Sequence, residues 1–335
     1  MKRLFLLFAL GTSLSSASAQ KLVVRMDDIG ATHSENVAVI KCYQEGIGRS
    51  AEIMPVCPWF LEAARMCNDN PGLDVGLHVA FSSEWSNYKW RPITYCPSLC
   101  DEDGYLKPFP QITDLKEAEA ELRAQIELGM KYVKNVTHIT DHMMWTFQPG
   151  MNDMVERVAK DYGLFYQGGK GDSRYGLNSL GIIMGQKDRE TVLLDLLTKM
   201  EKGKTYWVIE HPALEGPELE AIYTKDPSEN VGADRQNVTD AFCSPKVMKY
   251  IKEHYPKAHI SGAISNISFN LPYRKILNIA FAVLAINAGM DSAVMDPLNR
   301  DLRGAIYAAE AMIGEDYMCM EYIGAFREDI FGPQK

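Results

Sequence analysis

The stretch Lys21-Leu-Val-Val-Arg-Met-Asp-Asp-Ile-Gly30 decides the fold class of this 335-residue chain. Its first six residues are mostly apolar or β-branched, and two aspartates follow directly. Such a run is typical of a buried β-strand, so Asp27 and Asp28 should lie where a strand becomes a loop. In α/β folds this edge carries the functional groups, because loops and helix N-termini converge beyond the carboxyl ends of parallel strands.

The same arrangement recurs three times further along the chain. The recurrences are short apolar runs at residues 73–79, 136–142 and 206–212. Each run carries a histidine at or near its end, and these are His78, His142 and His211. The chain has only seven histidines, and random placement would scatter them over both ends of the strands. Four strand ends in succession therefore offer Asp-Asp, His, His and His at one edge.

Helical segments alternate with these strands. Asp114 and Glu117 form a capping signal for a helix whose apolar residues keep helical spacing. Those residues are Leu115, Leu122, Ile126, Met130 and Val133. The alternation and the chain length are compatible with one α/β barrel plus an extra lobe.

The residue types at the strand ends point to a cation site. One carboxylate and two neutral imidazoles form a common open coordination set for zinc or another divalent cation. We therefore expect Asp28, His78 and His142 to bind one divalent cation. Asp27 would act as general base toward a water molecule whose pKa the cation lowers, and His211 would face the leaving group.

His138 is a further candidate. It lies four positions before His142, which places both on the same face of an extended strand. His138 is therefore either a ligand or a residue that supports a ligand, and a purely structural role is the favoured alternative.

The first residues are typical of a secretory signal peptide, with a charged start, a short apolar run and the exit Ala-Ser-Ala at 17–19. A buried first helix is the alternative. We expect cleavage after Ala19 and export to the periplasm or the extracellular space. Cleavage would remove Lys2 and Arg3 from 35 basic side chains, leaving 33 against 44 acidic ones and a formal charge of −11. This balance argues against a nucleic-acid partner, and no later stretch is apolar enough to span a membrane.

At the strand ends the sequence resembles the YdjC-like family of carbohydrate deacetylases over about residues 22–251. Residues 26–30 look like the family's Ala-Asp-Asp-Phe-Gly opening, residues 76–78 like its Gly-x-His element and residues 210–213 like its His-Pro element. The resemblance implies an irregular (β/α) TIM-like barrel. It also implies a hydrolase that removes an acetyl group from a small N-acetylated, or O-acetylated, oligosaccharide.

The resemblance implies the same roles for the site residues. Asp27 would be the general base, and His211 would stabilise or protonate the departing amine. The divalent cation would be magnesium, as is usual in the family, although zinc would also suit the ligands Asp28, His78 and His142.

One motif departs from the family pattern. The family usually has Thr-His-x-Asp-x-His-x-His, whereas residues 137–144 read Thr-His-Ile-Thr-Asp-His-Met-Met. Thr140 thus replaces an aspartate and Met144 replaces the last histidine. Asp141 is a candidate for orienting a ligand, although its side chain should point opposite to that of Thr140 on a strand. These changes affect the predicted saccharide pocket more than cation binding.

Residues 82–112 have no clear periodicity and predict a long loop over the site. The aromatic side chains there either stack on sugar rings or pack the loop down. The candidate saccharide contacts are Trp85, Trp90 and Trp145. Cys96 and Cys100 either form a disulfide bond or remain free thiols.

A second resemblance covers residues 259–325. Residues 261–269, 271–274 and 289–297 look like the last part of a pterin-binding barrel, in which a methyl group passes from methyltetrahydrofolate to a corrinoid cobalt. Asn266 matches the asparagine that contacts the pterin. Read without the family, this part predicts strands at 259–264 and 292–295, a helix at 274–288 and a helix ending near Gly314.

These two βα units are about a quarter of a barrel, and the acidic pterin ligands of the earlier strands have no counterpart here. We therefore expect no working pterin site, and a fusion of unrelated segments with its junction between about Val247 and Ala258.

The sequence thus predicts a signal peptide at 1–19, a deacetylase barrel at 20–255 and an appended βαβα segment at 256–335 that is not functional alone. The predicted partner is a small acetylated saccharide, and a homodimer is left open. Two alternatives remain. One is a carbohydrate-binding barrel without catalysis, and the other is a pterin-dependent methyltransferase, which the C-terminal segment alone supports.

Overall fold

The computed structural model describes residues 20–168, 176–226, 228, 230–255, 261–264, 266–268, 271–287, 290, 292–296 and 298–333. The expected signal peptide at residues 1–19 lies outside the described residues, so its cleavage and the export of the chain stay predictions. Among the described helices, none combines the length and the apolar content that crossing a bilayer would require.

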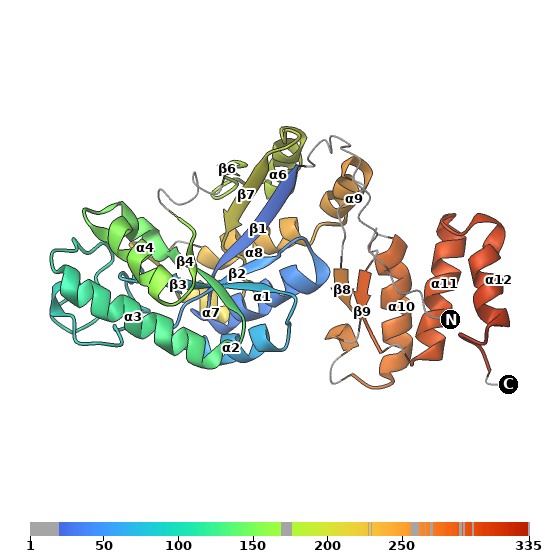
Figure 1. The fold of residues 1–335 in the computed structure, drawn as a ribbon, viewed down its shortest axis with the longest axis horizontal. Coiled ribbons are helices and arrows are strands. Elements are labelled where there is room, and N and C mark those ends of the chain that lie inside the picture. The colour runs from blue at the N-terminus through green and yellow to red at the C-terminus, as the bar shows by residue number, and fades with distance from the viewer. Residues whose placement is uncertain are drawn as a thin grey trace.

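Seven parallel strands form one curled sheet in the order β5-β4-β3-β2-β1-β7-β6 (Figure 1). The strands are β1 (Lys21–Ile29), β2 (Ser50–Ile53), β3 (Asp74–Val79), β4 (Val136–Asp141), β5 (Phe165–Tyr166), β6 (Leu177–Ser179) and β7 (Thr205–Glu210). All six pairings are parallel. Within the described residues β5 and β6 are not paired with each other, so the sheet is an open half-barrel. The α/β class is confirmed, and the closed TIM-like barrel is not.

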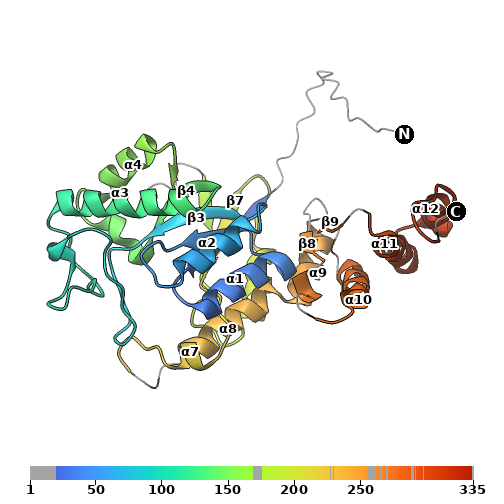
Figure 2. The same ribbon diagram turned by 90° about the horizontal axis from the view of Figure 1, so that it is seen from below.

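The helices follow the order of the strands. They are α1 (His33–Glu45), α2 (Phe60–Asn68), α3 (Leu115–Tyr132), α4 (Met151–Asp161), α6 (Arg189–Thr198), α7 (Pro217–Glu220), α8 (Val231–Phe242) and α9 (Pro245–His254). Contacts run from α4 through α3, α2, α1 and α8 to α6. Figure 2 shows α4, α3, α2, α1 and α8 following one another along the sheet. The apolar core lies between this layer and the strands.

The predicted helix after residue 114 is confirmed as α3. The Asp114 side chain accepts hydrogen bonds from the backbone N–H groups of Lys116 and Glu117, as the capping signal predicts. The carboxylate of Glu117 does not return to the cap. It accepts instead from the backbone N–H and the hydroxyl of Ser98, at 3.0 and 2.6 Å, and so fastens the predicted loop to α3.

The loop at 82–112 is irregular, as predicted, apart from the 3₁₀ turn Pro97–Leu99 and a single antiparallel bridge between Cys100 and Leu106. Both thiols that were candidates for a disulfide bond, those of Cys96 and Cys100, are free in this structure.

The C-terminal segment builds a second, smaller unit beside the sheet (Figures 1 and 2). Its elements are β8 (Ser261–Ala263), α10 (Arg274–Asn287), β9 (Ser292–Val294), α11 (Arg300–Ile313) and α12 (Met320–Arg327). β8 and β9 pair in parallel, and β8 also contacts α1. The elements lie within a few residues of their predicted bounds. Gly314 ends α11 with a φ of 86°, as expected for a helix C-terminus.

Candidate active site

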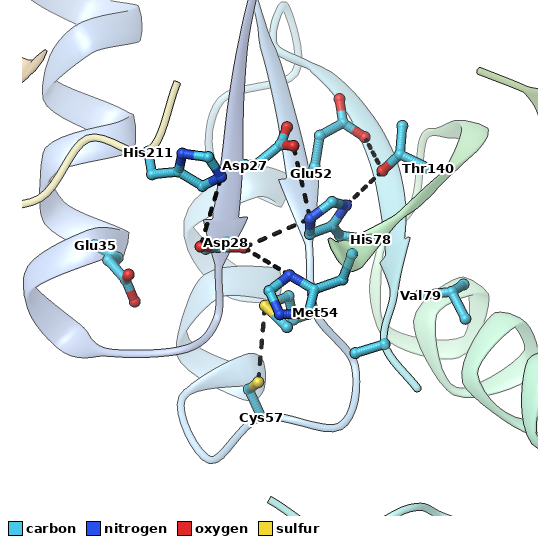
Figure 3. A network of polar contacts seen from close by, with 12 residues as sticks. Asp27, Asp28, Glu35, Glu52, Met54, Cys57, His78, Val79, Thr140 and His211 are labelled. Carbon is cyan, nitrogen blue, oxygen red and sulfur yellow. Dashed lines mark hydrogen bonds and ion pairs between the residues drawn. The ribbon is translucent and has the colours of Figure 1, made fainter. Parts of the chain in front are cut away.

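The end of β1 is irregular, and this irregularity assembles the site. The register between β1 and β2 shifts between Met26 and Ile29, and Asp28 has a φ of 75°, a strained value for a residue other than glycine. On a regular strand, neighbouring side chains point to opposite faces. Here both carboxylates face His78, whose Nε2 lies 3.6 Å from Asp27 Oδ2 and 3.5 Å from Asp28 Oδ1 (Figure 3).

Three predicted ligands meet at this point. Asp28, His78 and His142 are buried, and each offers one ligand atom within 4.8 Å of the others. Asp28 Oδ1 lies 3.2 Å from His142 Nδ1 and is a buried oxygen without a hydrogen-bond partner. A buried, unsatisfied carboxylate oxygen facing two imidazoles is costly unless a cation satisfies it. The donor set and this oxygen therefore fit a divalent cation.

His142 is placed by a sharp turn rather than by a strand end. β4 ends at Asp141, and His142 begins a 3₁₀ turn in which Met143 and Met144 have φ values of 58° and 55°. The Nε2 of His142 lies 3.0 Å from a carboxylate oxygen of Glu84, which belongs to the 82–112 loop. Burial alone would lower the pKa of His142, but the carboxylates of Glu84 and Asp28 raise it to about 10.

His78 is held on the side away from the aspartates. Its Nδ1 lies 2.8 Å from the Thr140 hydroxyl, and that hydroxyl lies 3.1 Å from Glu52 Oε2 (Figure 3). Burial lowers the pKa of His78 to about 4, so its ring is neutral at neutral pH, which is the form that binds a cation.

Arginines hold both aspartates. Arg25 donates from Nε and Nη2 to the two oxygens of Asp27, at 2.8 and 2.9 Å. Arg235 on α8 donates to Asp28 Oδ2 at 3.0 Å and to Glu35. Burial would raise the pKa of Asp28, but the charges of His211, His142 and Arg235 hold it well below its usual range. Asp28 is therefore an anion, and its Oδ1 faces the two imidazoles.

His211 follows β7 directly and lies at the rim of the site. Its Nε2 is 4.0 Å from Asp28 Oδ2, and its side chain is about a quarter exposed (Figure 3). Burial lowers the pKa of His211. The structure thus brings together all five residues predicted from the strand ends.

The two additional candidates lie outside this cluster. His138 Nε2 is 3.0 Å from Glu52 Oε1. His138 therefore contacts Glu52, which lies next to Thr140, and not Asp27 or Asp28. Asp141 accepts from the backbone N–H and the hydroxyl of Thr146, and burial raises its pKa. Both side chains support the walls of the site.

The three candidate tryptophans are almost completely buried, at 2 to 3% exposure. Trp90 donates to the Ser82 carbonyl at 3.0 Å and Trp145 to the Val79 carbonyl at 2.7 Å. Trp85 packs against Trp90, and the guanidinium of Arg235 lies over its ring at 5.3 Å. Of the two alternatives, these rings favour packing the loop down over exposing a face to a sugar.

A pocket of about 300 Å³ lies beside the turn that carries His142. Its lining residues are Phe81, Ser82, Pro108, Phe109, Pro110, Gln111, Met143, Trp145 and Gln148. Trp145 thus borders the pocket, whereas Trp85 and Trp90 are not among its lining residues. The exposed side chain of Phe109 is a better candidate for contact with a ligand than the predicted indoles of Trp85 and Trp90.

Five residues of the site were missed by the sequence prediction, and one of them, Arg25, lies two positions before the Asp27 that it holds. Glu52 interrupts an apolar run, and a lone charge there could have indicated a buried partner. Glu84 lies in an aperiodic loop and gives no such signal. Glu35 and Arg235 come from different helices, and Arg235 lies 207 positions from Asp28, so only the fold brings them together.

Fold and site define a parallel α/β protein with a His/Asp cluster suited to a cation at the carboxyl edge of its sheet. The chain belongs to the YdjC-like protein family, whose profile matches residues 21–253. A carbohydrate deacetylase from Geobacillus stearothermophilus is 28% identical over 204 residues, which are 57% of this chain and 78% of that protein. One from Thermoanaerobacter pseudethanolicus is 26% identical over 248 residues, 70% of this chain and 94% of that protein.

A solved structure shares the fold. It is a protein of Enterococcus faecalis V583 named for cellobiose-phosphate cleavage, and it matches with a TM-score of 0.58 and 22% identity. The match covers 70% of this chain and 95% of that chain.

The C-terminal part has a different relative. A methylcorrinoid:tetrahydrofolate methyltransferase from Eubacterium limosum is 52% identical over 83 residues, which are 25% of this chain. The chain spans only 31% of the length of that protein. Asn266 begins a 3₁₀ turn, and its side chain lies outside the described residues, so the structure does not test its predicted pterin contact.

Proposed function

We propose that this chain is a cation-dependent carbohydrate deacetylase that hydrolyses an acetyl group on a small N-acetylated, or O-acetylated, saccharide. The observation that carries the proposal is the unsatisfied Asp28 Oδ1, buried between the nitrogens of His78 and His142. Membership of the YdjC-like family and the deacetylase relatives support the reaction class.

Asp28, His78 and His142 would hold the cation. A divalent cation bound there would polarise the acyl oxygen and lower the pKa of a water molecule. Magnesium or zinc would both suit this mixture of one carboxylate and two imidazoles.

Asp27 is the carboxylate positioned to accept the proton of the attacking water. Arg25 binds both of its oxygens, so the carboxylate cannot rotate away from His78. This fixed geometry suits a general base, because proton transfer requires heavy atoms within hydrogen-bond distance.

His211 is positioned to protonate the leaving amine nitrogen, or the leaving alcohol oxygen of an ester. Its partial exposure supports contact with a substrate. Burial lowers its pKa, which makes the protonated ring a stronger acid. The pocket beside His142 would take the saccharide, with Gln111 in its lining for contact with hydroxyl groups.

The test is elemental analysis of the purified chain together with acetate release from N-acetylated chito-oligosaccharides and acetyl esters. The wild type is compared with Asp28→Asn, which keeps the side-chain volume and removes the charge. We expect about one cation per chain and acetate release, with both lost in the variant. Cation without acetate from any substrate would favour a binding protein without catalysis. Acetate release unchanged in the variant would refute the assignment of the site.

We do not propose methyl transfer for the C-terminal segment, because the chain spans less than a third of the methyltransferase relative. We also propose export to the periplasm or the extracellular space. This rests on residues 1–19 alone.

A further inference from the structure

The two histidines of the cluster are supported in different ways. His142 has a carboxylate directly behind it, because Glu84 lies 3.0 Å from its Nε2. Among the described residues, no carboxylate lies at hydrogen-bond distance from His78 Nδ1, which contacts the Thr140 hydroxyl instead, at 2.8 Å. A histidine that binds a metal usually donates its second N–H to a carboxylate or carbonyl, which selects its tautomer. The support of His78 therefore requires another group.

That group is Glu52. The Thr140 hydroxyl lies 3.1 Å from Glu52 Oε2, so it can accept from His78 and donate to the carboxylate at the same time. A carboxylate only accepts hydrogen bonds, so the proton of the hydroxyl must point to Glu52 and its lone pair to His78. This order leaves the proton of His78 on Nδ1 and its Nε2 free to face Asp28.

The strand register explains how Glu52 reaches this position. Glu52 on β2 pairs with Gly76 on β3, and Gly76 pairs with His138 on β4. A Cβ atom at Gly76 would lie 2.0 Å from Glu52 Oε2 and 2.4 Å from His138 Nε2. The missing side chain therefore opens the passage through which Glu52 crosses β3 toward β4.

The carboxylate is held firmly once it is there. Its Oε1 accepts from the Ser50 hydroxyl at 2.9 Å and lies 3.0 Å from His138 Nε2, while its Oε2 faces Thr140. Glu52 and Thr140 are fully buried, so water does not compete for these bonds. His138, a candidate ligand by sequence, thus contacts Glu52 instead of the cluster of Asp28, His78 and His142.

We propose that Glu52 and Thr140 are positioning residues that fix the Nδ1–H tautomer of His78 and so prepare its Nε2 for the cation. The role in cation binding rests on the proposed function, whereas the choice of tautomer does not. Neither residue touches the cation or the substrate. Glu52, Thr140 and His78 thus form a buried relay. In it the carboxylate of Glu52 acts on His78 from a different strand.

The experiment measures the full chain in two ways. Two-bond ¹H–¹⁵N NMR spectra of the metal-free chain report the tautomer of His78, assigned by its loss in His78→Ala. Titration calorimetry with Zn²⁺, and separately with Mg²⁺, reports cation affinity. The variants are Thr140→Val, which removes the hydroxyl at nearly constant volume, and Thr140→Ser, which keeps it. Thermal unfolding checks that each variant is folded.

In Thr140→Val we expect a mixture of tautomers and an affinity about 10- to 100-fold lower, the usual effect of losing a group behind a metal ligand. Thr140→Ser should retain the tautomer and the affinity of the wild type. Ser50→Ala is the matched control, because it removes a buried hydroxyl from the other oxygen of the same carboxylate. It should leave both readouts unchanged.

A further variant tests the relay without depending on the hydroxyl. Thr140→Asp combined with Glu52→Gln places a carboxylate directly beside His78 Nδ1, and it should restore the tautomer that Glu52→Gln alone weakens. An unchanged tautomer and affinity in Thr140→Val would overturn the proposed positioning role. A wild type that keeps the tautomer but binds neither cation would refute the proposed function and leave the relay standing.

Discussion

The half-barrel at residues 20–255 and the C-terminal segment at residues 261–333 differ in how far they bury their apolar side chains. The half-barrel buries one continuous apolar core, and most of the charges buried at its edge have partners. In the described part of the segment, the apolar cluster holds three buried residues, Ile264, Ala282 and Leu302. Ala309, Ala325 and Phe331 are buried outside this cluster. The segment's described surface carries many large apolar side chains, among them Leu284, Leu298 and Met312.

The difference shows what a complete layer of helices contributes. A βα unit buries its apolar faces only against neighbouring units, and the half-barrel supplies such neighbours on every strand except the two edge strands. The described part of the segment has two strands, and many large apolar side chains of its helices stay exposed. All five site residues predicted at the strand ends lie in the half-barrel. Function and stability should therefore both depend on that part.

The largest expected effect is at the cluster itself. His78→Ala removes a ligand and leaves the buried Asp28 carboxylate with one imidazole fewer. Cation retention and acetate release should fall by more than the roughly 10- to 100-fold typical of changes behind a ligand. Elemental analysis and acetate assays measure both. The control is His254→Ala in the exposed C-terminal turn of α9, and equal losses in both variants would contradict the assignment.

A second prediction contrasts the two cores. Leu77→Ala on β3 creates a cavity in the large core and should cost about 2 to 5 kcal/mol of unfolding free energy. Leu302→Ala in the small cluster should not change the stability of the half-barrel. Tryptophan fluorescence during urea unfolding separates the two, because all five tryptophans lie at residues 59–207. A clear shift of this signal in Leu302→Ala would show that the two cores unfold together.

A third prediction concerns acid. Burial would raise the pKa of Glu52, but His138 and Arg25 lower it to about 2. A carboxylate whose pKa is lower in the folded chain stabilises it above the usual pKa of about 4.5, and this contribution is lost as the pH falls toward 2. Its size is at most roughly 3 to 4 kcal/mol, at about 1.4 kcal/mol per pKa unit.

Acid titration followed by tryptophan fluorescence tests this contribution. Glu52→Gln should lower stability at pH 7 and flatten its decline below pH 4.5, relative to the wild type. The control is Glu201→Gln at an exposed ion pair with Lys204, which should change neither value appreciably. Parallel curves for the wild type and Glu52→Gln would contradict the lowered pKa.

The smallest expected effect comes from removing the segment. A chain that ends at Tyr255 keeps the hydrogen bond from the Tyr255 hydroxyl to the Leu197 carbonyl, at 2.6 Å, and retains the whole site. Its acetate release and its fluorescence midpoint in urea should match those of the full chain, which would support the predicted boundary at 255. A large loss of either would mean that the contact of β8 with α1 supports the half-barrel.

The strand ends were predictable because each signal is local. An apolar run that stops at Asp27-Asp28, or at His78, identifies both the strand and the edge on which its side chain lies. The capping of α3 by Asp114 and the end of α11 at Gly314 were predicted for the same reason. β2 was missed, because Glu52 lies in the middle of it and a charge normally argues against a buried strand.

The amino-acid sequence by itself determined the α/β class, the five residues of the cluster and the resemblance of the C-terminal segment to a methyltransferase. Short-range periodicity and the order of motifs carry that information. Only the tertiary structure decided that the sheet is open, that Trp85 and Trp90 pack the loop, and that Glu52, Glu84 and Arg235 surround the site. These contacts join residues far apart in the chain. A buried charge or indole is tolerated only beside partners that the fold brings together, and no local pattern records those partners.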